Sequence, residues 1–79
     1  PLPKYLAGLS ADGTAIHFWD SETGTPLETC RLPKGYAALT FLPSPDQKTF
    51  HLFARNEASK VATRFTAAVG DKAPTVLTN

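Results

Sequence analysis

Apolar and polar residues alternate along most of this 79-residue chain, and glycine, proline and aspartate interrupt the alternation at short intervals. Alternation is typical of β-strands, because successive side chains of a strand point to opposite faces. No segment keeps the 3.6-residue period of an amphipathic helix. The pattern predicts an all-β antiparallel meander of about seven short strands, at residues 4–10, 14–20, 26–32, 36–43, 48–54, 59–66 and 74–78.

Four polar segments separate these strands and predict tight turns. Asp12-Gly13 favours a two-residue hairpin turn, because both residues tolerate a positive φ angle. Ser44-Pro45-Asp46-Gln47 is the next clearest, since proline fixes φ at the second position of a turn. Residues 56–59 and 69–72 carry weaker turn signals of the same kind.

Bulky residues occupy both faces of the predicted central strands. In the strand over 14–20, Ile16 and Phe18 point one way, whereas His17 and Trp19 point the other. The strand near 37–42 has the same character, with Leu39 and Phe41 assigned to one face and Ala38 and Leu42 to the other. A sheet with one solvated face would instead alternate with polar residues. Two-sided burial predicts a sheet stacked between neighbouring sheets, as in a propeller or a sandwich. The later strand at 59–66 is more polar and is expected to be less buried.

Length and charge narrow the class of protein. Residues 1–79 suffice for one small all-β unit, and the apolar core of so small a chain is marginal on its own. The net charge of +1 comes from residues of both signs spread along the chain, without the basic patch of a nucleic-acid-binding protein. No segment approaches the roughly 20 apolar residues that span a bilayer, so no membrane partner is expected. The single cysteine, Cys30, excludes an internal disulfide and favours a reducing intracellular compartment such as the cytoplasm.

An internal repeat can be aligned in two alternative registers. A shift of 34 residues aligns Ser10-Ala11-Asp12 with Ser44-Pro45-Asp46, whereas a shift of 46 residues aligns Trp19 with Phe65. The second shift lies close to the 40–45 residues that are typical of one propeller blade. It is therefore the register that we favour from the sequence.

The run from Ser10 to Gly24, in which Trp19-Asp20 closes an apolar strand, resembles a blade of the WD-repeat β-propeller family. The resemblance implies that residues 4–32 form three strands of one blade and residues 36–78 most of a second. It also implies structural roles, inside blades and turns, for Ser10, Asp12, Trp19, Asp20 and Asp46. The sequence departs from the family where Gly35-Tyr36 replaces a glycine-histidine pair and Phe65-Thr66 replaces tryptophan-aspartate.

Catalytic signals are lacking in the sequence. The two histidines, His17 and His51, have no spacing that suggests metal ligation, and Cys30 is expected to be a buried thiol. The indole N–H of Trp19 needs a partner if it is buried, and Ser10 or Asp12 across a hairpin could supply one. No catalytic, cofactor-binding or metal-binding residue is therefore predicted.

These observations favour a non-catalytic scaffold for protein–protein interaction, whose partner is a protein or further copies that complete the sheets. The expected contact residues lie in turns: Ser21, Glu22, Lys34, Tyr36, Arg55 and Asn56. The alternative is a self-contained small β-barrel or sandwich that oligomerises and either binds nucleic acid or builds a structural assembly. In that case aromatic residues on one sheet face would stack on bases: Tyr36, Phe41, Phe50 and Phe53.

Overall fold

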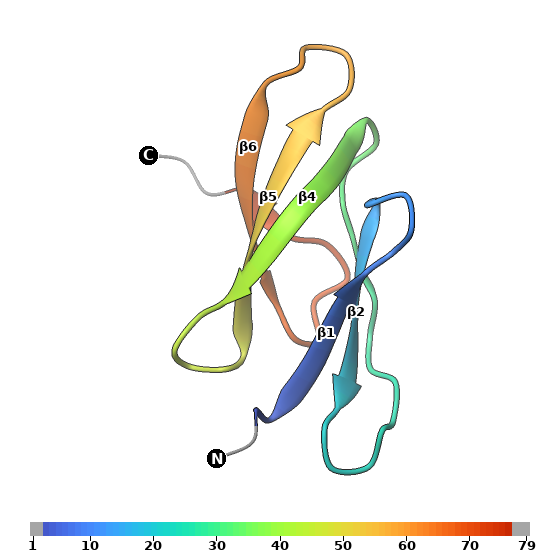
Figure 1. Ribbon diagram of the computed structural model, residues 1–79, viewed down its shortest axis with the longest axis vertical. Coiled ribbons are helices and arrows are strands. Elements are labelled where there is room, and N and C mark those ends of the chain that lie inside the picture. The colour runs from blue at the N-terminus through green and yellow to red at the C-terminus, as the bar shows by residue number, and fades with distance from the viewer. Residues whose placement is uncertain (1–2, 77–79) are drawn as a thin grey trace.

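A computed structural model describes residues 3–76 and confirms the all-β prediction (Figure 1). The seven strands are β1 (Tyr5–Leu9), β2 (Ala15–Asp20), β3 (Cys30–Arg31), β4 (Tyr36–Pro43), β5 (Thr49–Asn56), β6 (Ala62–Ala68) and β7 (Thr75–Val76). They form two antiparallel meanders, one with the order β1-β2-β3, called sheet I here, and one with the order β4-β5-β6-β7, called sheet II. Within residues 3–76 there is no helix that could cross a membrane.

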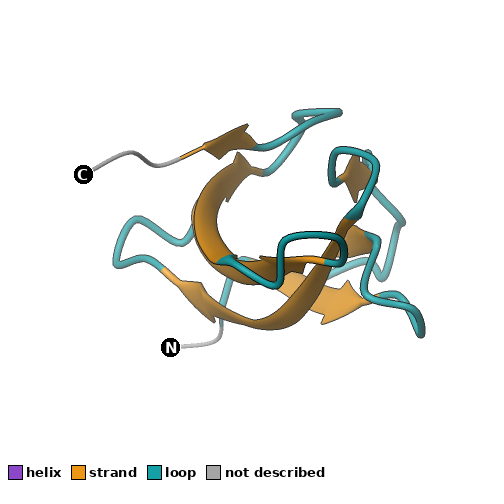
Figure 2. Ribbon diagram, turned by 90° about the horizontal axis from the view of Figure 1, so that it is seen from above, coloured by secondary structure: helices purple, strands orange, loops and turns teal. Residues whose placement is uncertain are grey.

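The two sheets share one apolar core. Phe18 of β2 and Phe50 of β5 meet with their ring centroids 5.2 Å apart, and Phe65 of β6 is fully buried beside them. Viewed from above, the twisted strands curl around this common centre (Figure 2). The buried residues of the cluster are Ile16, Phe18, Cys30, Leu32, Ala38, Phe50, Leu52, Ala54, Phe65 and Ala67.

Three main-chain hydrogen bonds outside the strand ladders tie distant segments together. The amide of Ala38 in β4 donates to the carbonyl oxygen of Gly13 at 2.7 Å, so the β1–β2 turn lies directly against sheet II. Leu32 donates to the oxygen of Thr14, and Arg31 donates to the oxygen of Lys72. The bond from Leu32 continues the pairing of β2 with β3, whereas the other two bonds connect sheet I to β4 and to the loop that follows β6.

The predicted strand at 26–32 is mostly irregular, and only β3 remains. Trp19 forms an isolated bridge with Pro26, a register that would place Ile16 opposite Thr29. Ile16 instead pairs with Cys30, so the pairing slips by one residue in between. The main-chain bonds on either side of the Pro26 bridge, from Leu27 to Phe18 and from Asp20 to Thr25, are formed, so the irregularity lies between Leu27 and Cys30.

The predicted faces of β4 are wrong because the strand contains a bulge. Ala38 pairs with Ala54, but the next paired residue is Thr40, so Leu39 has no partner in the ladder. The extra residue puts Ala38 and Phe41 on the same, core-facing side. Leu39 and Leu42 are instead 66% and 56% exposed.

The last strands also differ from expectation. Phe65 and Ala67 of β6 are fully buried, because β6 lies inside sheet II between β5 and β7. Arg64 occupies the opposite face of the same strand, whereas Thr63 shares the face of Phe65 and Lys60 lies in the preceding turn. Of the segment predicted at 74–78, β7 covers Thr75–Val76, and residues 77–78 lie outside the described part of the chain.

Candidate interaction site

Two turns of the same type follow the first strand of each sheet. In the turn after β1, the hydroxyl of Ser10 and the amide of Thr14 donate to one carboxylate oxygen of Asp12, at 2.8 and 3.0 Å. In the turn after β4, the hydroxyl of Ser44 and the amide of Lys48 donate to Asp46 in the same way, at 3.2 and 2.9 Å. The fourth position has positive φ in both turns, at 77° in Gly13 and 62° in Gln47. The turn geometry therefore repeats with the shift of 34 residues.

A second type of turn follows the second strand of each sheet, β2 in sheet I and β5 in sheet II. The side chain of Asp20 accepts hydrogen bonds from the amides of Glu22 and Thr23, at 2.9 and 3.1 Å. Asn56 accepts from the amides of Ala58 and Ser59 at 3.0 and 2.9 Å. Each of these turns ends on a residue with positive φ, Gly24 in one and Lys60 in the other. The side chains of Asp20 and Asn56 thus hold the backbone of their own turns.

The turn carboxylates are stabilised in their ionised form by the groups that donate to them. The hydroxyl and amide of Thr14, together with the hydroxyl of Ser10, lower the pKa of Asp12 from 3.8 to about 2. Hydrogen bonds from the Thr23 and Glu22 amides lower the pKa of Asp20, and the Lys48 amide does the same for Asp46. A carboxylate with a lowered pKa is a poor general acid or base near neutral pH.

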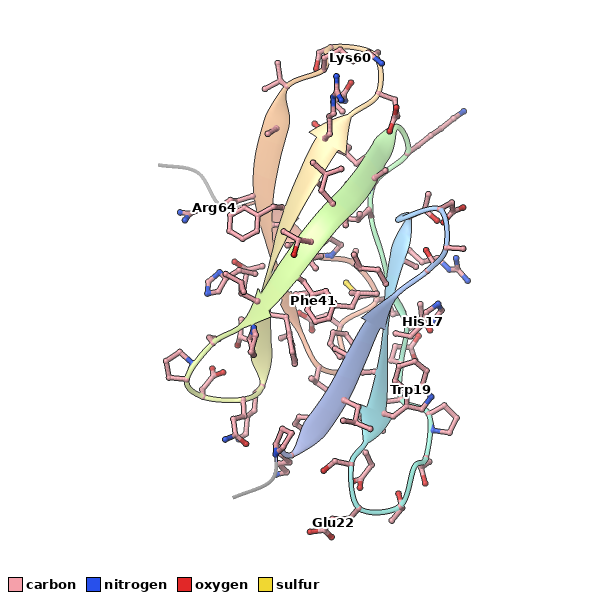
Figure 3. The ribbon with its side chains drawn as sticks, viewed as in Figure 1. His17, Trp19, Glu22, Phe41, Lys60 and Arg64 are labelled. Carbon is pink, nitrogen blue, oxygen red and sulfur yellow. The ribbon has the colours of Figure 1, made fainter. Side chains whose placement is uncertain are left out.

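Trp19 lies on the outer face of sheet I, away from the core (Figure 3). It pairs with Leu6, and its ring covers Gly8, where a Cβ atom would be 3.6 Å from the indole. Asp12 lies beyond the opposite end of this hairpin, so the expected hydrogen bond from the indole to Ser10 or Asp12 is absent. The ring is only partly buried, and its N–H does not need a protein partner.

His17 shares this outer face with Trp19. The two rings have centroids 6.1 Å apart, and Nδ1 of His17 lies 3.1 Å from the Thr29 hydroxyl. Leu6, opposite Trp19, remains 49% exposed. The outer face of sheet I is thus an aromatic and apolar surface, which we define by Leu6, Gly8, His17 and Trp19.

Sheet II has a corresponding outer face. Phe53 of β5 pairs with Thr40 on one side and with Arg64 on the other, and it is only partly buried. The neighbouring outward pair is Leu42 and His51. We define this outer face by Thr40, Leu42, His51, Phe53 and Arg64. Both sheets therefore carry a His-x-aromatic sequence on the side that faces away from the shared core.

The six predicted contact residues are divided between two ends of the molecule. Ser21 and Glu22 lie in the β2–β3 turn at one end (Figure 3). The other four lie where the start of β4 meets the end of β5, a junction that the bond from the Glu57 amide to the Gly35 oxygen closes. They are Lys34, Tyr36, Arg55 and Asn56. The six residues therefore do not form one continuous surface.

Three of these six side chains have a structural contact within the chain. The hydroxyl of Ser21 donates to the carbonyl oxygens of Pro3 and Lys4, at 2.6 and 2.8 Å. Tyr36 packs edge-on against Phe65, with centroids 5.2 Å apart, and Asn56 holds its own turn. The other three are exposed: Glu22, Lys34 and Arg55. Similarly, Phe50 is buried in the core and cannot belong to a base-stacking surface.

Cys30 is inaccessible in the folded chain. Its side chain is fully buried between the sheets, and burial together with the charge of Asp71 raises its pKa to about 11. A thiol in this state is a weak nucleophile. Among the described residues, no group of three or more His, Cys, Asp or Glu side chains could hold a metal ion.

An apolar groove between the two sheets has no counterpart in the sequence-based predictions. It has a volume of about 220 Å³ and lies between the first strand of sheet I and β4, with Tyr5, Ala7, Phe41 and Phe50 among its lining residues. Phe41 lies between the two sheets in Figure 3. The sequence signal that could have identified the groove is the uncharged segment Tyr5–Leu9, which carries no edge-protecting residue.

Comparison with models of known protein families, with curated proteins and with solved structures gives no match to this chain.

Proposed function

We propose that this chain is a non-catalytic scaffold for protein–protein interaction, in which sheets I and II are two blade-like layers of a larger stack. The observation that carries the proposal is that both outer faces present large apolar side chains that are exposed or only partly buried, which on sheet II lie among Thr40, His51 and Arg64. In a small protein that works alone, the faces that point away from the core are normally polar. Here they present Leu6, Trp19, Leu42 and Phe53.

The relation between the two sheets supports stacking on sheet I. A shift of 46 residues carries β1 onto β5 and β2 onto β6, and the strands of each pair run in the same direction (Figure 1). This shift carries Leu6 onto Leu52 and Trp19 onto Phe65. Leu52 and Phe65 are fully buried against sheet I. The outer face of sheet I thus corresponds to the face that sheet II already buries.

The converse relation supports stacking on sheet II. The same shift carries the core-facing residues Ala7 and Phe18 onto Phe53 and Arg64. Phe53 and Arg64 lie on the outer face of sheet II, so this outer face corresponds to the face with which sheet I packs. One interface, repeated head to tail, would therefore extend the stack in both directions, as in the blades of a WD-repeat-like propeller.

The turn chemistry supports a scaffold over an enzyme. Asp12, Asp20 and Asp46 use their carboxylates to fix turns, and the buried thiol of Cys30 is removed from solvent. Loops held in this way are rigid, and the turn held by Asp20 can present the exposed side chain of Glu22 to a partner.

Sedimentation equilibrium of the purified chain over a wide concentration range tests the proposal. We expect the mean molar mass to rise above the 8.5 kDa of one chain as concentration increases. Leu6→Lys and Leu42→Lys should each suppress this rise, because stacking would bury an unpaired charge. Val61→Lys is the matched control, since Val61 is equally exposed, at 59%, but lies in the turn before β6. A wild-type chain that stays monomeric and folded throughout would contradict the proposal.

The alternative of a self-contained sandwich that assembles with its own copies is favoured by two observations. Both sheets share a single core, and the turn geometry repeats with the shift of 34 residues, which carries the core-facing Ile16 and Phe18 onto the core-facing Phe50 and Leu52. For this alternative, we expect one discrete oligomer whose mass does not depend on the outer-face residues. The same lysine variants distinguish the two, because only the stack depends on both outer faces.

A further inference from the structure

We infer that the free edge of β1 binds an extended, apolar peptide segment of a partner protein, which adds to sheet I as an antiparallel strand. This inference deepens the proposed scaffold function and rests on it, because it specifies how one partner is recognised. It concerns the edge of sheet I and the groove beside it, not the two outer faces.

The hydrogen-bond register of β1 leaves one side of the strand open. Ser10 donates to the oxygen of Ala15, and Ser21 donates to the oxygen of Lys4. In an antiparallel ladder, alternate residues bond to the same neighbour. The main-chain groups of Leu6, Gly8 and Ser10 and the carbonyl oxygen of Lys4 therefore face β2, whereas the Lys4 amide donates to the side-chain oxygen of Gln47.

The main-chain N–H and C=O groups of Tyr5, Ala7 and Leu9 point the other way. Within residues 3–76 none of these groups takes part in a hydrogen bond, since β1 is the edge strand of sheet I. Six unpaired groups in a row provide three donors and three acceptors at strand spacing. Only another extended backbone matches that arrangement.

Two other sheet edges, β3 and β4, carry features that discourage strand addition. β3 has only two residues, and its Arg31 amide is already bonded to Lys72. β4 contains the bulge at Leu39, ends at Pro43 and donates its Ala38 amide to Gly13. Short length, bulges and proline are the usual protections of edges. β1 has five residues and contains no charge, proline or bulge.

The groove beside β1 specifies the side chains of the added strand. It runs along the open edge between Tyr5 and Ala7 on one side and Phe41 on the other, with Phe50 among its lining residues. Alternate side chains of an added strand would enter this space, and apolar ones fit its lining. A volume of about 220 Å³ accommodates a few side chains of a single strand.

Sheet II shows what such an addition looks like. The shift of 46 residues that carries β1 onto β5 leaves β4 without an equivalent in sheet I. β4 pairs antiparallel with β5 on the edge that corresponds to the open edge of β1. An added strand at β1 would give sheet I the same four-strand order as sheet II.

A synthetic peptide with the sequence of β4, residues 36–43, flanked by lysines for solubility, is a suitable probe. In ¹H–¹⁵N spectra of the full chain, we expect saturable shifts of the Tyr5, Ala7 and Leu9 amides. Ala7→Pro removes one outward N–H, and proline is tolerated at such an edge position. Loss of one hydrogen bond should weaken binding about tenfold. Equal binding by wild type and Ala7→Pro would overturn the inference.

Alternately N-methylated peptides provide a measurement that does not depend on the folding of a variant. N-methylation at one set of alternate positions should abolish binding, whereas N-methylation at the other set should leave binding nearly unchanged. Only one set of peptide N–H groups faces β1. Equal effects of both sets would contradict strand addition. If the chain forms a dimer that Ala7→Pro dissociates, and the chain does not bind the peptide, the inference is overturned. The β1 edge would then pair with a second copy of the chain. If Leu6→Lys and Leu42→Lys do not suppress the rise in molar mass, while the peptide still binds, the stack is refuted but strand addition at β1 is not.

Discussion

The carbonyl oxygen of Gly13 accepts a hydrogen bond of 2.7 Å from the amide of Ala38, and there is no room for a side chain at Gly13. A Cβ atom on Gly13 would lie 2.7 Å from the carbonyl oxygen of Ala38. The backbone of Gly13 also has a φ of 77°, a conformation that residues with a Cβ atom rarely adopt. This contact joins the first turn of sheet I to β4 and fixes how the sheets meet.

Gly13→Ala should therefore destabilise the chain by more than the cost of positive φ alone, which is about 1–2 kcal/mol. The added methyl group would collide with a main-chain oxygen, and the Ala38 bond would be strained or lost. The measurement is the free energy of unfolding from urea titrations followed by Trp19 fluorescence.

Gly24→Ala is the control for this comparison. Gly24 has a similar φ of 74°, but no atom lies within 4 Å of its Cβ position. Gly24→Ala should lower the free energy of unfolding only by the cost of positive φ, about 1–2 kcal/mol. If both variants lost the same stability, the close contact between Gly13 and Ala38 would be refuted.

The positions of the turns were predicted from sequence, but the two-residue hairpin expected at Asp12-Gly13 is wrong. Residues 11–14 separate the bonded pair Ser10 and Ala15, and only Gly13, not Asp12, has positive φ. Asp12-Gly13 and Ser44-Pro45-Asp46-Gln47 specify their geometry through local hydrogen bonds, which depend only on nearby residues. The bulge at Leu39 could not be foreseen, because it depends on how β4 meets β5 and Gly13. That single extra residue reversed the predicted faces of the strand.

The candidate site was predicted less well than the fold. Trp19 was expected to bond to Ser10 or Asp12, but the antiparallel register places it opposite Leu6. The open edge of β1 was not predicted, because the uncharged composition of Tyr5–Leu9 does not by itself show which strands pair. Pairing between segments far apart in the chain is set by tertiary packing.

Acid should destabilise the chain through its turn carboxylates. The pKa of Asp12 in the folded chain, about 2, is lower than its ordinary value of 3.8, so its contribution is complete above pH 3.8. As pH falls from 3.8 to about 2, this contribution is lost. Asp12→Asn should reduce stability at neutral pH and flatten the acid dependence, as measured by thermal unfolding at a series of pH values.

Glu28→Gln is the control for the acid series, because Glu28 is exposed and takes no part in the turn hydrogen bonds. This variant should keep the wild-type acid dependence between pH 3.8 and 2. An Asp12→Asn variant with an unchanged acid dependence would mean that the bonds from Thr14 and Ser10 do not stabilise the carboxylate.

Cys30 should be unreactive in the folded chain. Its burial between the sheets excludes reagents, and its pKa of about 11 keeps the thiol protonated near pH 8. We expect no reaction with a disulfide reagent under native conditions and stoichiometric reaction in denaturant. Rapid native modification would show that the core between β2, β3 and sheet II opens readily.

Trp19 offers the most direct measurement of the proposed stack, because it is the single tryptophan and lies on the outer face of sheet I. If a further sheet covers this face, the indole leaves water as the chains associate. We predict that the emission maximum of Trp19 shifts to shorter wavelength with increasing concentration, in parallel with molar mass, and that Leu6→Lys abolishes the shift. An emission maximum that stays constant while the molar mass rises would contradict stacking through this face.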